Sequence, residues 1–228
     1  MVRFQFKIIL FKEIVVMRKY FILFLAINIT SLYALIGGAG INIVQDQFTI
    51  SEKTDELIID EAFTTSEINN PVGVGGFVYL TLIPFIDLEA GYNFTIATYK
   101  YEYFGLDEIE FPIGKGTWYT SLQYPFFSPP TMRLYVGAGA NGTGWLQPIT
   151  VDVLSDLESE GKEFDDEDAL VDALTKSSNG YHIELGARFK PPLFPISING
   201  NARYIMDKDF HDDLDGYLTV TVGLAFAI

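Results

Sequence analysis

The residues best suited to acid–base chemistry in this sequence are its two histidines, and the first candidate is His211. Asp209 and Asp213 flank it, and a carboxylate beside an imidazole can orient the ring so that it activates water for hydrolysis. Such a site would make the protein a hydrolase. Because so short a spacing is a weak signal by itself, the elements that hold these residues must decide whether the site can form.

The second histidine, His182, follows two serines. Ser177 or Ser178 beside a histidine base would suggest an esterase that acts on lipids. The alternating pattern described below places His182 on an inward face, however. That position predicts a histidine that is hydrogen-bonded inside the protein.

A run of acids, Asp165-Asp166-Glu167-Asp168, could hold Ca²⁺ or Mg²⁺ through carboxylate oxygens. No segment has the spacing of an EF-hand loop, and no glycine-rich phosphate loop with its lysine is present. A solvated charge run is therefore the better interpretation. The sequence predicts no catalytic residues, no metal ligands and no cofactor, so we expect a protein that is not an enzyme.

The composition restricts the partners that the protein can have. Its 228 residues include 15 Lys and Arg against 30 Asp and Glu, which gives a net charge of −15. Nucleic acid is excluded as the main partner because phosphate binding needs a basic face. Cysteine is absent, which excludes disulfides, thiolate zinc sites and cysteine nucleophiles. Because 49% of the residues are nevertheless hydrophobic, we expect a membrane-spanning chain whose charge is concentrated in a few segments.

The N-terminal segment has the layout of a secretory signal peptide. Met17-Arg18-Lys19 is a short basic region, residues 20–29 are almost wholly apolar, and residues 30–34 are polar or small. The apolar stretch is too short for a membrane-spanning helix, which needs about 20 residues. We expect translation to start at Met17 and cleavage to follow Ala34, so that residues 1–34 are the signal peptide and residues 35–228 the mature domain. A membrane-anchoring helix is the alternative.

The mature chain alternates between apolar and polar or small residues, which is the period of a β-strand. No later stretch has 18 consecutive apolar residues, so no helical membrane span is expected. The final segment is the clearest, because every second residue from 218 to 228 is large and apolar. Eight such segments occur, near residues 35–43, 74–82, 86–96, 118–124, 133–141, 181–190, 196–206 and 218–228.

The connections between these segments alternate strictly between short and long. The short ones are rich in proline, which suits a turn because proline cannot donate to a strand ladder. The long ones are acidic and cover about residues 44–71, 104–112, 147–180 and 207–216. An even strand number, short turns and long loops predict an all-β fold: an eight-stranded antiparallel up-and-down transmembrane barrel with periplasmic turns and extracellular loops. Within the third long loop, residues 151–157 and 166–176 have helical spacing.

The strand period assigns a direction to each side chain. The expected lipid-facing residues of the last strand are Leu218, Val220, Val222, Leu224, Phe226 and Ile228. Aromatic residues near the turns are expected to ring the periplasmic interface: Phe85, Tyr124, Phe126, Phe127, Phe189, Phe194 and Phe226.

The inward face carries charges of both signs, namely Asp87, Glu89, Arg133, Glu184, Arg188, Lys190 and Arg203. An eight-stranded barrel has an interior just wide enough for side chains to fill. A buried charge is costly unless it is paired, so we expect these residues to pair with one another. The prediction is a polar network that fills the lumen, and the alternative is a narrow path that conducts ions or small solutes.

Residues 35–228 resemble the small eight-stranded outer-membrane β-barrels, the group that includes the OmpA transmembrane domain. The resemblance rests on the signal peptide, the hairpin over residues 82–92, the strand over residues 135–139 and the final strand. It implies recognition by the barrel-assembly machinery through the C-terminal strand, which normally ends in an aromatic residue. This chain ends in Ile228 and has Phe226 two residues earlier.

The resemblance implies an outer-membrane location after cleavage of the signal peptide, with a structural role or a binding role of the loops. Outer-membrane lipids would surround the barrel, and the acidic loops would attract divalent cations or basic extracellular partners. Two other functions are considered. The Asp209–His211 spacing is similar to the Asp-x-His of the omptin outer-membrane proteases, but those barrels have ten strands and need a second acidic pair. A soluble lipocalin is also an eight-stranded barrel, but it usually has a helix after the last strand.

Overall fold

The computed structural model describes residues 37–57, 61–83, 85–103, 109–147, 174–192, 194–211 and 214–227. Several predictions concern residues outside these ranges: the signal peptide over 1–34, the helices before residue 174, the acids at 165–168, and the positions Asp213 and Ile228. Among the described residues, no helix is long and apolar enough to cross a membrane.

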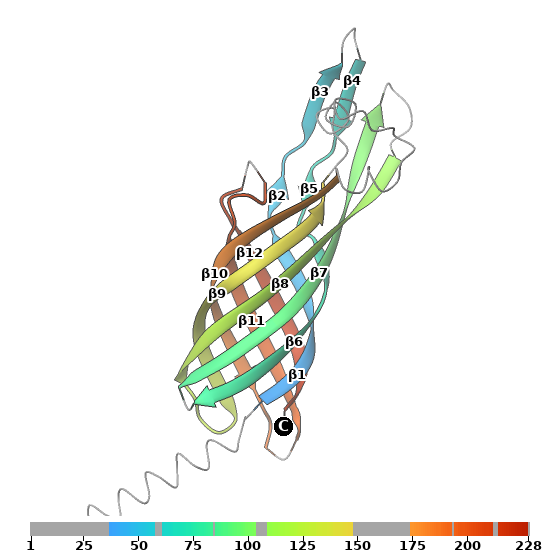
Figure 1. The fold of residues 1–228 in the computed structure, drawn as a ribbon. Coiled ribbons are helices and arrows are strands. Elements are labelled where there is room, and N and C mark those ends of the chain that lie inside the picture. The colour runs from blue at the N-terminus through green and yellow to red at the C-terminus, as the bar shows by residue number, and fades with distance from the viewer. Residues whose placement is uncertain are drawn as a thin grey trace, which may run out of the picture.

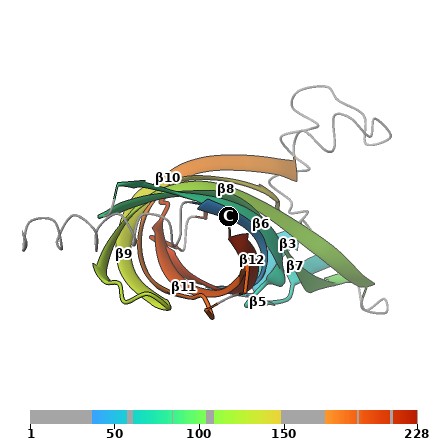
Figure 2. The same ribbon diagram turned by 90° about the horizontal axis from the view of Figure 1, so that it is seen from below.

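Eight long strands form a closed antiparallel barrel, as the alternation predicted (Figures 1 and 2). The strands are β1 (Gly37–Gln47), β6 (Val72–Ile83), β7 (Ile86–Tyr103), β8 (Ile109–Phe127), β9 (Met132–Leu146), β10 (Thr175–Phe189), β11 (Ile196–Met206) and β12 (Tyr217–Ala227). Each pairs with the next along this order, and β1 pairs with β12, from Gly38 with Ala227 to Gln47 with Leu218. Closure leaves the barrel without a free edge, which a membrane-spanning sheet requires.

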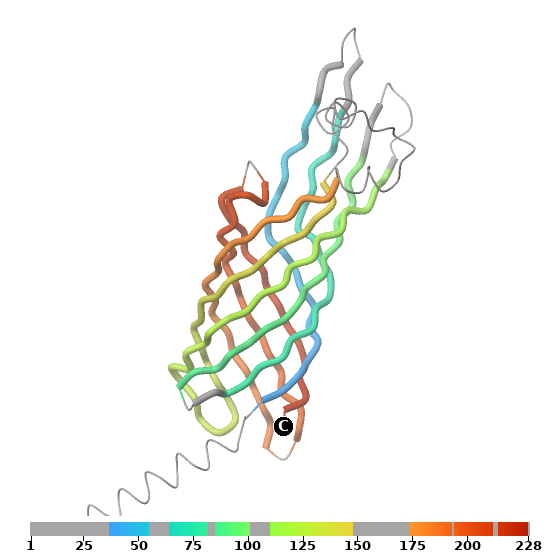
Figure 3. Tube along the Cα trace, viewed as in Figure 1, coloured from blue at the N-terminus to red at the C-terminus, as the bar shows by residue number. Residues whose placement is uncertain are grey.

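The two ends of the barrel differ as expected. The connections β6–β7, β8–β9 and β10–β11 are short and lie at one end, together with the last residues of β12 (Figure 3). The strands are longer at the other end than the sequence pattern predicted. Residues Thr175 and Lys176, expected at the end of a helix, instead begin β10, and β8 begins at Ile109 inside the expected second loop.

The first long connection is not the open loop that was expected. It contains four short strands, β2 (Thr49–Ile50), β3 (Lys53–Leu57), β4 (Glu61–Thr65) and β5 (Ile68–Asn69). Strand β4 pairs with β7 and β3 with β4, so the barrel sheet extends beyond the barrel (Figure 1), whereas β2 and β5 pair as a separate two-stranded sheet. Ile50 and Ile68 are buried here, so the segment keeps an apolar face that favours strands over loop.

The strand faces have opposite environments. On β1, Ile41 is 72% exposed whereas its neighbour Asn42 is 7% exposed, and on β12 Val222 is 58% exposed whereas Thr221 is 7% exposed. Leu224 and Phe226 are exposed like Val222, whereas Leu218 and Val220 near the other end of β12 are half-buried. The aromatic residues assigned to the turn end are all exposed, namely Phe85, Tyr124, Phe126, Phe127, Phe189, Phe194 and Phe226. Apolar side chains thus cover the outside, and polar side chains the inside.

The candidate functional site is the barrel lumen

The lumen brings six of the seven predicted charges into one continuous network. They are Asp87, Glu89, Arg133, Glu184, Arg188 and Arg203, and each is no more than 5% exposed. The seventh, Lys190, follows the last residue of β10 and is half-buried, so it lies in the turn. The network combines three carboxylates with three guanidinium groups, so its formal charges balance.

Asp87 on β7 is the carboxylate nearest the turn end. Nη1 of Arg133 donates to both of its oxygens, at 2.7 and 2.6 Å, and Nη1 of Arg188 approaches Oδ2 at 3.3 Å. Arg188 also reaches Oε2 of Glu89 at 3.2 Å. One guanidinium group from β10 therefore joins two acids that lie on the opposite wall, and this cross-lumen link supports the shape of the barrel.

Glu184 is the second centre of the network. Its Oε2 accepts from Nη2 of Arg203 at 2.8 Å and from Nδ2 of Asn201 at 2.9 Å. Its Oε1 accepts from Nε2 of Gln123 at 2.9 Å. Arg203 also lies 3.6 Å from Oε1 of Glu89, which connects this centre to the first. Every oxygen of Glu184 thus has a donor, as a buried carboxylate requires.

The two central arginines are stacked on tyrosine rings. The guanidinium carbon of Arg188 lies 3.6 Å from the ring centre of Tyr79, and that of Arg203 lies 3.5 Å from the ring centre of Tyr119. Cations over ring faces are stabilised by the ring quadrupole, most strongly where water is excluded. These tyrosines face the lumen from β6 and β8, so the sequence could have indicated them by their alternation.

Inward glycines provide the room for these large side chains. A Cβ atom on Gly186 would clash with the ring of Tyr135, and one on Gly139 would clash with the backbone oxygen of Thr120 and lie 2.8 Å from the ring of His182. No side chain fits at Gly186 while the ring of Tyr135 stays where it is, and none fits at Gly139 without a shift of the backbone. The small residues that alternate along the strands therefore serve to pack the lumen.

A second ion pair lies nearer the long connections, and the sequence interpretation missed it. Asp46 had been assigned to the first acidic loop, but it is 2% exposed and lies on β1. Its Oδ2 accepts from Nζ of Lys115 at 2.8 Å, and its two oxygens also accept from Thr95 at 2.9 Å and Thr219 at 2.6 Å. Lys115 donates in addition to the hydroxyl of Tyr217 at 2.9 Å. The pair connects the first, middle and last strands of the barrel.

An apolar cluster packs against Lys115 of this pair. Its buried members are Phe48, Ile50, Ile68, Tyr99, Ile113, Trp145, Ile205, Phe210 and Tyr217. Phe210 comes from the connection between β11 and β12 and is 1% exposed; its ring centre lies 5.4 Å from Phe48, 5.1 Å from Trp145 and 5.2 Å from Tyr217. The connection over 207–216 was predicted to be an exposed acidic loop, but it places this ring inside the barrel mouth.

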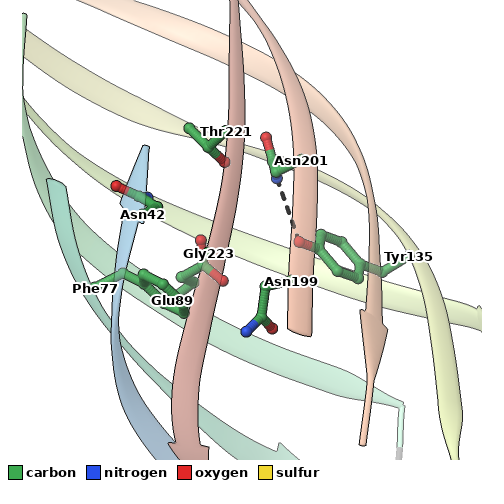
Figure 4. A pocket seen from close by; sticks show the side chains of 8 residues that line it. All are labelled: Asn42, Phe77, Glu89, Tyr135, Asn199, Asn201, Thr221 and Gly223. Atoms are coloured by element: carbon green, nitrogen blue, oxygen red, sulfur yellow. Dashed lines mark hydrogen bonds between the residues drawn. The ribbon is translucent and has the colours of Figure 1, made fainter. Parts of the chain in front are cut away.

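Between the charged network and the β1–β12 seam lies one small cavity (Figure 4). It is lined by Asn42, Phe77, Glu89, Tyr135, Asn199, Asn201, Thr221 and Gly223. The room for the centre of a water molecule is about 10 Å³, the size that holds one water. Figure 4 also shows Asn201 donating to the hydroxyl of Tyr135, at 3.4 Å. This cavity is too small for a solute.

His182 does not assemble the site that its neighbouring serines suggested, and Asp213, the predicted partner of His211, lies outside the described residues. Nε2 of His182 lies 2.8 Å from the hydroxyl of Ser121, whereas Ser177 is exposed and Ser178 donates to Asp207 at 2.7 Å. Both His182 and Ser121 are 1% exposed inside the lumen, where a lipid substrate cannot reach them. His211 forms a bridge with Leu214, and its ring lies 5.9 Å from that of Trp145. No group of three acids, histidines or cysteines suited to a metal occurs among the described residues.

No protein-family model matches the sequence, and no curated protein does. Among solved structures, the outer-membrane protein OprG from Pseudomonas aeruginosa superimposes with a TM-score of 0.53 over 85% of this chain and 96% of that chain, at 12% identity. The chain has the fold of an eight-stranded outer-membrane β-barrel. At this identity the similarity establishes the fold alone, so the activity of the barrel must be argued from its own residues.

Two further structures resemble the barrel. Ail from Yersinia pestis gives a TM-score of 0.46 at 12% identity and covers 85% of this chain and 99% of that chain. The N-terminal β-barrel domain of OprF from Pseudomonas aeruginosa gives 0.42 at 10% identity and covers 84% and 99%.

Proposed function

We propose that the protein is a non-enzymatic outer-membrane barrel whose filled lumen makes it a rigid scaffold for its long acidic connections. The proposal rests on two groups of side chains that fill the interior. The network around Arg188 and Arg203 crosses the lumen, and the apolar cluster with Phe210 covers the barrel mouth. Bulk solute therefore has no route through the described part of the chain.

The outer face supports a lipid environment. Apolar side chains such as Ile43, Val74, Leu185 and Leu224 are 70%, 63%, 56% and 55% exposed. An apolar face this extensive is unfavourable in water, and in a membrane it contacts acyl chains. Secretion through a signal peptide ending at Ala34, and assembly through the C-terminal strand, complete the proposed route to the outer membrane.

The acidic connections support the binding role. The third one, over residues 147–180, carries more Asp and Glu residues than any other connection. Loops held by a rigid scaffold commonly carry binding function. A negative crown favours basic partners or cations over polyanions, through an attraction that weakens as salt rises.

Fractionation tests the location. The mature chain should remain with outer membranes after alkaline carbonate extraction. It should also migrate differently on gels before and after boiling, because a closed barrel has no edge from which to unravel. Recovery as a soluble periplasmic monomer without detergent would contradict the proposal and favour the lipocalin alternative.

Planar-bilayer recording tests the closed lumen. The reconstituted barrel should produce no steady conductance, because side chains fill its interior. Steady single-channel steps whose ion selectivity changes in Arg203→Glu would establish a narrow channel instead.

Peptide binding to the reconstituted barrel tests the acidic connections. A basic peptide should bind in a salt-sensitive manner, and deletion of residues 151–173 should abolish that binding.

A further inference from the structure

Among the described residues, the buried carboxylate of Asp207 differs from the other buried acids by having no cationic partner. The buried acids among the described residues are Asp46, Asp87, Glu89, Glu184 and Asp207, and the buried lysines and arginines are Lys115, Arg133, Arg188 and Arg203. The first four acids each lie within 3.6 Å of a lysine or arginine nitrogen. Asp207 is 1% exposed, and in the described part of the chain its side chain bonds only to the hydroxyl of Ser178.

The buried charges therefore leave one negative charge without a counter-charge. His182 does not supply it, because its Nδ1 has no partner and an imidazolium ion would need an acceptor for each of its two N–H groups. The uncompensated charge is located at Asp207, whose Oδ1 has no hydrogen-bond partner. A buried carboxylate in that condition is strongly unfavourable unless something neutralises it.

The surroundings of Asp207 offer further oxygen atoms. Asn141 on β9 is 1% exposed, and neither atom of its amide has a partner. A Cβ atom added to Gly180 would lie 3.1 Å from Nδ2 of Asn141 and 3.0 Å from Cβ of Asp207. The amide of Asn141 and the side chain of Asp207 therefore both border the space that Gly180 leaves open. Because no described group fixes the amide orientation, its oxygen can turn toward this space.

Hydroxyl groups continue this wall of the lumen. Thr143 on β9 pairs in register with Thr117 on β8 and with Ser178 on β10. The hydroxyls of Thr117 and Thr143 are buried and have no partner, whereas that of Ser178 already contacts Asp207. Carboxylate, amide and hydroxyl oxygens are the donors that hard cations prefer.

We propose that Asp207, with Asn141 and the hydroxyls of Ser178 and Thr143, binds one small monovalent cation such as Na⁺ inside the barrel mouth. A single positive charge balances the buried charges. The site has one carboxylate, which suits a monovalent ion better than Ca²⁺ or Mg²⁺. Asp207 directly follows the last residue of β11 and precedes Phe210 by three residues, so the bound ion would also hold the connection that places Phe210 in the mouth.

Thermal unfolding of the folded chain in detergent tests the site. The unfolding midpoint is compared between sodium chloride and N-methyl-D-glucamine chloride at equal ionic strength. The unfolding midpoint should rise with Na⁺ to a plateau about 5 °C above the value in the bulky cation, since a ligand bound only to the folded state stabilises it. Asp207→Asn should abolish the difference. The matched control Asp209→Asn changes an exposed acid two residues away and should keep it.

The ²³Na line width provides a second readout that does not depend on the variant folding well. The wild-type barrel should broaden the signal, and excess K⁺ should compete with the broadening. Equal midpoints in both salts, with no broadening, would overturn the proposal and indicate a neutral carboxyl group or bound water. A stabilisation by Ca²⁺ or Mg²⁺ alone would overturn the monovalent assignment, and a sodium effect that survives in Asp207→Asn would overturn the site.

Discussion

Replacement of Arg203 by methionine is expected to lower the free energy of unfolding by about 3–5 kcal/mol. The substitution keeps most of the aliphatic length but leaves Glu184 without its cation, and Glu184 is 5% exposed. Glu89 keeps a partner, because Arg188 lies 3.2 Å from it. The loss of the stacking on Tyr119 adds to the effect. Denaturant titration of the refolded barrel in lipid vesicles measures the change.

The double variant Arg203→Met with Glu184→Gln separates the pair from the packing. Removing both charges avoids an uncompensated buried carboxylate, so the double variant should regain more than half of the lost stability. Lys208→Met, at an exposed position, should change stability by less than about 0.5 kcal/mol. If the single and double variants are equally unstable, the cost arises from packing, and the lumen charges are not the paired network described here.

The residues of this network were predictable because strand alternation assigns a direction to every side chain. The charged residues alternate along each strand with large apolar residues that face the other way, as Glu184, Arg188 and Arg203 do. The structure places these three in the lumen. The partners were not predictable. Arg188 contacts Asp87, which is 101 positions away in the sequence, and such a contact depends on strand register and barrel closure.

Asp46 and Asp207 show where the sequence interpretation failed. Asp46 and Asp207 were counted with the acidic loops because the apolar outer face ends before them. The inward period nevertheless continues, since Asp46 follows Asn42 and Val44 at alternate positions, and Asp207 follows Arg203 and Ile205. Extending the period past the apolar band would have identified both acids. Strands that project beyond a membrane lose their apolar outer face but keep their inner one.

Phe210 had no comparable signal. It lies between Asp209 and His211 in a connection, where neither alternation nor helical spacing applies. Its burial depends on contacts with Phe48, Trp145 and Tyr217, which come from three different strands or strand ends. Only the closed barrel brings these rings together, so an aromatic residue that the local sequence presents as part of a loop becomes part of the core.

Replacement of Val222 by arginine is expected to destabilise the barrel in lipid by about 2–4 kcal/mol. Val222 is the middle residue of β12 and is 58% exposed on the apolar outer face, beside Ile43 of β1 and Gly200 of β11. A charged group near the middle of a bilayer must be moved out of water, and the small neighbour Gly200 offers it no partner. Denaturant titration in vesicles measures the loss.

Val222→Leu keeps the position apolar and is the matched control, with an expected change below about 1 kcal/mol. The depth of the position in the bilayer supplies a second comparison. The penalty of Val222→Arg should arise from contact of the charge with hydrocarbon, because an exposed arginine is harmless in water. An arginine placed closer to the membrane surface should therefore destabilise the barrel less. A barrel that tolerates Val222→Arg and stays folded without detergent would have its outer face in water. The lipocalin topology would then explain the alternation better than a membrane does.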